Sequence, residues 1–211
     1  MAGKELFDFQ HLLDEFTASK TPENHILIDQ YVSAFNDLSR FFVLLGTAFG
    51  FVSKDINEKV GILKAHRAEN PEHFLTIQSM VAYEVENNLT KAKTKSGLLS
   101  GSRTLLRLHR TMDFVAKFLG RLQGMADDEY TSKPASEEYN NSLGHFHPWM
   151  IRKLAGVAMY TLPTRKVFIE KYCKQEKEEL EKLVGPTSAI MTEIHEITQQ
   201  LYTDNDLLDL P

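Results

Sequence analysis

Cysteine is almost absent from this sequence, and so are long apolar runs. Cys173 is the only cysteine, so the chain cannot form an internal disulfide, which favours a reducing compartment. The longest apolar run, residues 41–52, is too short to span a bilayer. The start of the chain, M-A-G-K-E-L-F-D-F-Q, has early acids, no apolar segment of a signal peptide and no glycine at position 2 for myristoylation. We therefore expect a soluble protein of the cytoplasm.

The chain also lacks a surplus of positive charge and the short motifs of common enzyme classes. It has 24 Lys and Arg against 29 Asp and Glu, a formal net charge of −5, which argues against broad binding of nucleic acid. It contains no G-x-S-x-G, no P-loop, no G-x-G-x-x-G dinucleotide fingerprint and no H-E-x-x-H. The sequence therefore indicates a protein that is not an enzyme and that needs no metal, nucleotide or other cofactor.

Apolar residues recur at i, i+3 and i+4 along almost the whole chain, whereas strict alternation is rare. This pattern predicts an all-α protein. A chain of 211 residues with 42% hydrophobic and 25% charged residues suits one domain, residues 1–211, with no internal repeat. Loops are expected at 91–102 and 126–138. Helices are expected at 7–19, 27–65 (bent near Gly46 and Gly50), 71–90, 103–125, 147–162, 164–173, 174–184 and 186–203.

Three arginines in S-R-T-L-L-R-L-H-R-T-M-D-F-V-A-K-F-L are the most informative residues of the chain. Arg103, Arg107 and Arg110 follow one another at i, i+4 and i+7, so they form one narrow stripe on a helix. Phe114 and Phe118 continue this stripe, so the three cations lead directly into apolar surface. The chemical counterpart of such a face is an amphiphile that joins an anionic head, such as a phosphate, to hydrocarbon.

The other faces of this helix indicate its surroundings. One broad apolar face lies opposite the arginines and contains Leu105, Leu108, Met112, Val115 and Leu119. A third side, expected to face solvent, contains His109, Asp113, Ala116, Lys117 and Gly120. A helix between two layers has this pattern. Two structural explanations of the arginines stay open: a solvated face, or ion pairs with carboxylates of neighbouring helices.

Two further polar positions lie at the ends of apolar stripes. Asp55 and Lys59 have i, i+4 spacing, which is typical of an ordinary intrahelical salt bridge. The same spacing also fits a ligand site, in which the carboxylate accepts from an N–H of the ligand and the lysine faces the phosphate of the ligand. His147 opens H-P-W at an expected helix start, where a histidine is commonly a helix-end or core-boundary residue. His145 and His147 diverge at i, i+2 and have no supporting Cys or His pair, so we expect no zinc site.

Trp149 is the only tryptophan, and it lies on a different side of its expected helix from His147. Arg152 and Lys153 follow it closely. The tryptophan fits either of two environments, the protein core or the headgroup level of a membrane, which tryptophan prefers. Trp149 and Arg152 are therefore candidate membrane-docking residues.

Five segments together resemble the glycolipid transfer protein superfamily over essentially the whole chain. They are F-V-S-K-D-I-N-E-K (51–59), S-R-T-L-L-R-L-H-R (102–110), H-P-W-M-I-R-K (147–153), T-L-P-T-R (161–165) and the final L-L-D-L-P. The resemblance implies an all-α, two-layer helical sandwich that encloses one lipid. It implies that Asp55 and His147 bind the amide of a sphingoid backbone. It also implies a phosphate site built from Lys59, Arg103 and Arg107, with further contributions from Arg110 and Lys95.

The resemblance favours the branch of the superfamily that carries ceramide-1-phosphate. In the sugar-binding branch a tryptophan platform stacks on the sugar, whereas the matching region here presents Arg103. We therefore expect a monomeric, non-enzymatic lipid carrier that docks transiently on Golgi, endosomal or plasma membranes near Trp149, Arg152 and the 91–95 segment. Carriers of a neutral glycosphingolipid or of phosphatidic acid are the alternatives within the superfamily. Outside it, the alternatives are a phospholipid hydrolase that uses His147 and Asp55, and an interaction scaffold.

Overall fold

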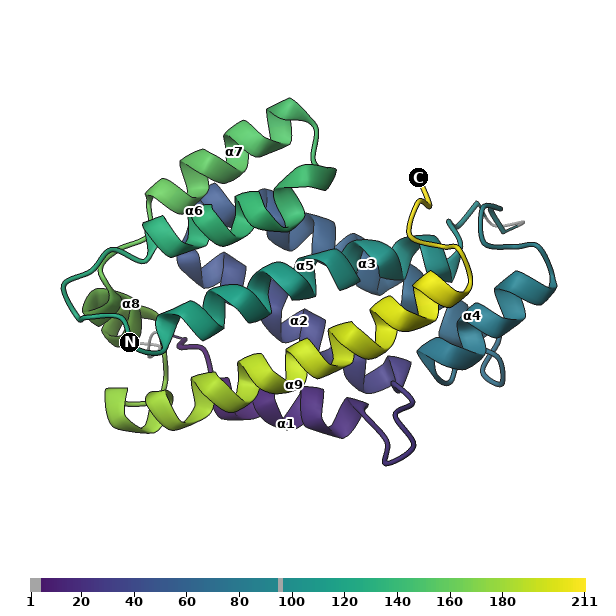
Figure 1. Ribbon diagram of the computed structural model, residues 1–211, viewed down its shortest axis with the longest axis horizontal. Helices are drawn as coiled ribbons and strands as arrows, with labels where there is room; N and C mark the ends of the chain where they lie inside the picture. The colour runs from purple at the N-terminus through teal and green to yellow at the C-terminus, as the bar shows by residue number, and fades with distance from the viewer. Residues whose placement is uncertain (1–4, 95–96) are drawn as a thin grey trace.

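The computed structural model describes residues 5–94 and 97–211 (Figure 1), so Lys95 lies outside the described residues. Within these ranges the regular elements are helices, which confirms the predicted all-α class. None of them is both long and apolar enough to cross a membrane. In chain order they are α1 (Phe9–Ser19), α2 (Ile28–Leu45), η1 (Thr47–Phe49), α3 (Gly50–Glu69), α4 (Ile77–Glu86), α5 (Gly101–Leu122), α6 (Ser132–Asn141), η2 (Leu143–Phe146), α7 (Trp149–Tyr160), α8 (Arg165–Tyr172) and α9 (Lys177–Asp204).

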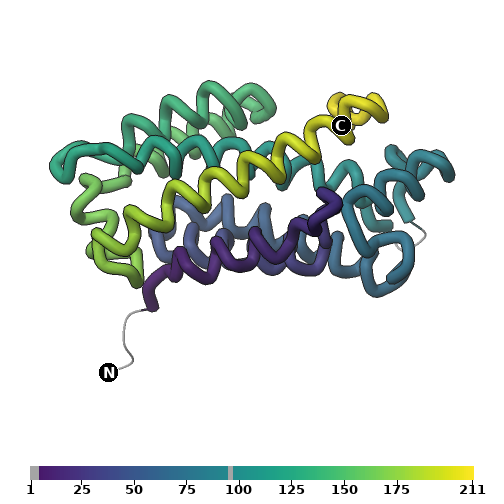
Figure 2. Tube along the Cα trace, turned by 60° about the horizontal axis from the view of Figure 1, so that its bottom comes forward, coloured from purple at the N-terminus to yellow at the C-terminus, as the bar shows by residue number. Residues whose placement is uncertain are grey.

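The helices form two layers, as predicted. Figure 2 shows α1, α2 and α3 in one layer and α5, α6 and α7 in the other, with α9 running along both. The contacts agree with this arrangement, because α9 packs against α1 and α5, and α3 packs against α5. Helix α5 is therefore covered on several sides, and one of its faces is directed at α3 across the space between the layers.

The N-terminus of α5 is fixed by a buried carboxylate from α4. The backbone N–H groups of Gly101 and Ser102 donate to Glu84 at 2.6 and 2.8 Å, and Glu84 is buried. Its negative charge lies at the positive end of the helix, where it is stabilising. A Cβ at position 101 would lie 2.5 Å from Met80 Sδ and 2.8 Å from the Phe74 ring, so only glycine allows this close approach. The first turn of α5 is thereby held in place.

The predicted faces of α5 are partly right. The apolar face is buried as expected and contains Leu105, Leu108, Met112, Val115 and Leu119. The side expected to face solvent is not exposed throughout, because His109 and Ala116 are buried. The reason is α9: the side chain of Ser188 bonds to the carbonyl of Ala116, and Gln199 bonds to the ring of His109.

Several predicted helix boundaries are wrong for identifiable reasons. The expected helix 27–65 is interrupted at Gly46, whose φ of 118° is a conformation that favours glycine. The expected start at residue 71 moves to Ile77, because Thr76 and Ser79 form a reciprocal capping box there. The loop expected at 126–138 contains most of α6, in which Pro134 occupies the first turn, where proline is tolerated.

The C-terminal part of the chain forms one long helix instead of the two expected. Helix α9 continues through Pro186, although proline removes one backbone hydrogen bond from a helix interior. Buried residues on both sides of it, Leu183 and Thr187, keep this stretch packed against its neighbours. After α9 the tail docks through Leu207 and Leu210, which are buried.

Candidate functional site

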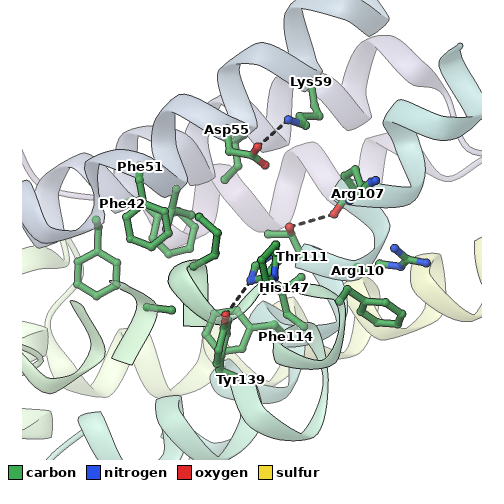
Figure 3. A pocket seen from close by; sticks show the side chains of 18 of the residues that line it. Phe42, Phe51, Asp55, Lys59, Arg107, Arg110, Thr111, Phe114, Tyr139 and His147 are labelled. Carbon is green, nitrogen blue, oxygen red and sulfur yellow. Dashed lines mark hydrogen bonds and ion pairs between the residues drawn. The ribbon is translucent and has the colours of Figure 1, made fainter. Parts of the chain in front are cut away.

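The principal cavity lies between the two layers and has a volume of about 450 Å³, within the usual range for small-molecule sites. In Figure 3 Phe42 and Phe51 gather at one side of this cavity, and Arg107 and Arg110 lie at the other. The polar residues of its wall are Asp55, Lys59, Arg103, Thr104, Arg107, Arg110, Thr111, Tyr139 and His147. Phenylalanine and aliphatic side chains form most of the remaining wall. The cavity is therefore amphiphilic, like the ligand that the arginine stripe suggests.

All three arginines of the stripe line the cavity, and all three are half-buried. In the described part of the chain, no carboxylate lies within ion-pair distance of Arg103 or Arg107. Among the described residues, the ion-pair explanation therefore does not apply to Arg103 and Arg107, and their half-buried position differs from that of a fully solvated face. A half-buried cation without a counter-charge loses hydration that nothing replaces. The arrangement therefore favours an anion in the cavity.

Arg110 is held differently from the other two arginines. Its Nη2 donates to the backbone carbonyl of Leu208 at 2.7 Å, and its guanidinium lies 3.7 Å from the ring centre of Phe146 in η2. Burial lowers the pKa of Arg110, and the charge of Arg107 lowers it further. Arg110 thus connects the cavity wall to the C-terminal tail and to the segment that leads into His147.

Asp55 and Lys59 form the i, i+4 salt bridge predicted from their spacing, with Lys59 Nζ 2.6 Å from Asp55 Oδ1. Both residues also line the cavity, so the salt bridge is confirmed and its two members lie where a ligand could reach them. The Lys59 side chain is 15% exposed and that of Asp55 is 58% exposed. The carboxylate at the open side of the cavity thus keeps acceptor capacity for a ligand.

His147 lines the cavity from the turn after η2, and its Nδ1 lies 2.7 Å from the hydroxyl of Tyr139 in α6. Burial lowers the pKa of His147; Asp55 raises it, while Arg107 and Arg110 lower it. Asp55 and His147 thus reach the cavity from different layers, although they are far apart in the sequence. Tyr139 is not among the candidate residues predicted from the sequence, because no local pattern indicates that α6 forms.

Trp149 is at the first position of α7 and does not line the cavity. Its 65% exposure excludes the core location that the sequence left open. Met150, Val157 and Tyr160 of the same helix are exposed apolar side chains as well. Arg152 is exposed, and Lys153 Nζ lies 5.7 Å from the centre of the Trp149 ring. Helix α7 therefore shows an aromatic and cationic surface on the outside of the molecule.

These features define a helical protein with an amphiphilic cavity. Comparison with known proteins places the chain in a family whose name has the same implication. Residues 26–174 match the family described as glycolipid transfer protein (GLTP), so the chain belongs to this family. Among curated relatives, the ceramide-1-phosphate transfer protein of Danio rerio is 39% identical over 209 residues, covering 98% of this chain and 99% of its own. The Homo sapiens protein of the same name is 36% identical over 208 residues, covering 98% and 94%.

Solved structures show the same similarity. The apo-form of mouse ceramide-1-phosphate transfer protein superposes with a TM-score of 0.89 at 36% identity, covering 97% of this chain and 100% of that one. The human protein in complex with 12:0 ceramide-1-phosphate gives a TM-score of 0.88 at 35% identity, with the same coverage. The two-layer sandwich is therefore the fold of this family.

Proposed function

We propose that this protein carries ceramide-1-phosphate between membranes. The family is one of lipid transfer proteins, and full-length relatives at 36–39% identity are named for transfer of this lipid. A crystal structure of the human relative contains the lipid. The cavity of this chain has the matching chemistry, because cations and an acceptor stand beside a wall of phenylalanine and aliphatic side chains.

One observation carries the proposal: Arg103 and Arg107 line the cavity without a carboxylate partner in the described residues. A lipid phosphate would supply the missing negative charge, and each charge-assisted hydrogen bond contributes roughly 1.5–3 kcal/mol. Lys59 would reach the same phosphate. Arg110 and Lys95 would add to the positive potential, Arg110 from its anchored position. A neutral glycosphingolipid would leave the two guanidinium groups without a counter-charge, which disfavours it.

Asp55 and His147 would bind the amide of the sphingoid backbone. The Asp55 carboxylate accepts from the amide N–H, and the imidazole of His147 meets the amide carbonyl. Phosphatidic acid has no amide N–H, so it would satisfy the arginines but not Asp55. The hydrocarbon chains would occupy the apolar part of the cavity. They contribute little to selectivity, although each CH₂ left in water would cost about 0.8 kcal/mol.

The exposed surface of α7 would dock the carrier on a membrane. Trp149 suits the headgroup level, and Arg152 suits an anionic surface. We propose that the protein acts as a monomer, as one domain over residues 1–211, in the cytoplasm and transiently on Golgi, endosomal or plasma membranes. It needs no cofactor and catalyses no reaction, so the lipid moves down its own concentration gradient.

Transfer between vesicles tests this proposal. Donor vesicles would carry fluorescent ceramide-1-phosphate, a neutral glycosphingolipid or phosphatidic acid, with unlabelled acceptor vesicles. Selective movement of ceramide-1-phosphate is expected, with the lipid recovered chemically intact after prolonged incubation. Preferential movement of the glycolipid would contradict the assignment of the arginines, and a cleaved lipid would favour the hydrolase. If no lipid moves, the scaffold is favoured.

Replacing the exposed tryptophan separates docking from binding. Trp149→Ala is expected to slow transfer several-fold while leaving the affinity for a short-chain, water-soluble ceramide-1-phosphate unchanged, because the indole lies outside the cavity. Tyr130→Ala, which also removes an exposed aromatic ring but lies beside Thr164, beyond the opposite end of α7 from Trp149, is the matched control. Equal slowing by both variants would contradict a docking role for Trp149.

A further inference from the structure

Tyr139 is the buried partner of the cavity histidine. It lies in α6, is 4% exposed, and its ring packs edge-on against Phe114 at a centroid distance of 5.9 Å and an angle of 89°. Its hydroxyl is 2.7 Å from His147 Nδ1 (Figure 3). No other hydrogen-bond partner of this hydroxyl occurs in the described part of the chain. The contact is therefore specific to one of the two ring nitrogens.

The turn between these two residues is built for close approach. The segment Y-N-N-S-L-G-H-F-H leaves α6, passes through η2 and returns His147 to Tyr139. A Cβ at position 144 would lie 2.8 Å from the carbonyl oxygen of Tyr139 and 3.2 Å from its ring, so Gly144 allows the turn to fold back onto the tyrosine. The backbone N–H of His147 then donates to the carbonyl of Gly144 at 3.3 Å. The distance between the two side chains is thus set by the backbone.

The hydrogen bond between the Tyr139 hydroxyl and His147 Nδ1 can have either group as the donor, and the two directions leave different groups without a partner. If Nδ1 carried the proton, it would donate to the tyrosine oxygen, and the tyrosine O–H would have no acceptor among the described residues of the protein. A buried unsatisfied donor is costly, whereas an oxygen with an unused lone pair is common. If the tyrosine donates to Nδ1, both groups are satisfied. Burial lowers the pKa of His147, which keeps the ring neutral and its Nδ1 lone pair available.

We propose that Tyr139 is a positioning residue that holds His147 as the Nε2–H tautomer, so that the nitrogen not bound to Tyr139 is always a donor toward the cavity. A lipid amide presents one N–H and one carbonyl. Asp55 can only accept, so the carbonyl needs a donor, and the tautomer set by Tyr139 supplies it. This inference rests on the proposed function, which it extends from the identity of the ligand to the reason for its amide selectivity.

The tautomer can be measured without any lipid. Long-range ¹H–¹⁵N correlation spectra of the side chain distinguish Nδ1–H, Nε2–H and the imidazolium form, and His147→Leu identifies the signal. The wild-type protein is expected to show the Nε2–H form, and Tyr139→Phe a mixture of both neutral forms. Tyr130→Phe, which removes an exposed hydroxyl, is the matched control and should leave the spectrum unchanged. An Nδ1–H or imidazolium form in the wild-type protein overturns the proposal.

Binding adds a second, independent test. Tyr139→Phe keeps the buried ring, so the melting temperature should change little, while the affinity for ceramide-1-phosphate should fall about two- to tenfold, as for one uncharged hydrogen bond. In a His147→Leu background the same substitution should cause no further loss, because the hydroxyl acts through His147.

The outcomes separate this inference from the proposed function. A loss of the same size in both backgrounds, or an unchanged tautomer and affinity in Tyr139→Phe, overturns the positioning role. Failure of the wild-type protein to bind ceramide-1-phosphate contradicts the proposed function instead. In that case the tautomer of the lipid-free protein still decides whether Tyr139 sets the state of His147.

Discussion

Two groups of arginines occupy opposite situations in this molecule. Arg165, at the start of α8, is 5% exposed and bonded through each of its three nitrogens: its Nε donates to the carbonyl of Leu122, its Nη1 to Asp127 at 2.9 Å and its Nη2 to Glu181 at 3.0 Å. Arg103 and Arg107 on α5 are half-buried, yet they have no carboxylate partner in the residues described. The protein thus provides carboxylate partners for the guanidinium of Arg165 and none, among the described residues, for those of Arg103 and Arg107.

The difference identifies which arginines serve the fold and which serve a ligand. A buried guanidinium that donates from each of its three nitrogens ties elements together, here α5, α8, α9 and the loop before α6. A guanidinium without a counter-charge adds no comparable link between elements, and the proposed role of Arg103 and Arg107 is to bind an anion from outside the chain. The family's lipids have an anionic head in the phosphate branch, so lipid binding would complete the pair. Each prediction below tests this distinction.

The largest effect is expected from removing an unpaired arginine. Arg107→Leu should weaken binding of ceramide-1-phosphate by about 10- to 150-fold, the equivalent of roughly 1.5–3 kcal/mol for a charge-assisted hydrogen bond. The melting temperature should stay the same or rise, because no internal ion pair is lost and an uncompensated cation is removed. Titration with short-chain lipid and calorimetric melting measure both quantities. Near-normal binding by the folded variant would contradict the assignment of Arg107 to a phosphate site.

The paired arginine should show the reverse behaviour. Arg165→Met should lower the free energy of unfolding by about 1–3 kcal/mol, because Leu122 O loses its donor while Asp127 and Glu181 are exposed enough to regain water. Lipid selectivity should be unchanged. Arg121→Met, which removes the ion pairs of a half-exposed arginine with Glu137 and Glu138, is the control and should destabilise less. Denaturant titration of the three proteins decides between these outcomes.

A smaller effect is expected when the charge is kept and the shape is changed. Arg107→Lys retains one positive charge but loses the planar fork that binds two phosphate oxygens at once. Binding should weaken by about three- to tenfold, less than in Arg107→Leu. If lysine restores full affinity, the cavity needs only positive potential and the geometric part of the assignment is wrong. If Arg107→Lys binds no better than Arg107→Leu, the shape of the arginine side chain matters more than its charge.

The stripe of arginines was predictable because helical periodicity is local. The spacing of Arg103, Arg107 and Arg110 specifies one face, and the opposite apolar face is buried as expected. The third face was misassigned, because His109 is buried by Gln199 and its neighbours on α9, a contact between residues 90 positions apart. No pattern within one helix reports which later helix will cover it.

The parts of the site that were missed depend on turns and caps. Tyr139 lies in a helix with a polar sequence and an early proline, so periodicity gave no signal there. Glu84 fixes the start of α5 through two backbone N–H groups, and sequence does not reveal which acid caps which helix. The tail contact from Leu208 to Arg110 likewise needs the complete fold. Local patterns identified the cations that line the cavity, whereas the residues that hold them in place required the structure.

The smallest expected effect is a change in the pKa of His147 when the positive charge of Arg107 is removed. Burial lowers the pKa of His147, and Arg107 lowers it further, so Arg107→Leu should raise this pKa, while Arg165→Met should leave it unchanged. The folded state then binds fewer protons than the unfolded state below about pH 6.5, so the wild-type protein loses stability as the pH falls through this range. The Arg107→Leu variant should lose less stability than the wild-type protein over the same pH range. NMR titration of the His147 ring measures the shift directly, and an unchanged pKa in Arg107→Leu would mean that the charge of Arg107 is already neutralised in the lipid-free protein.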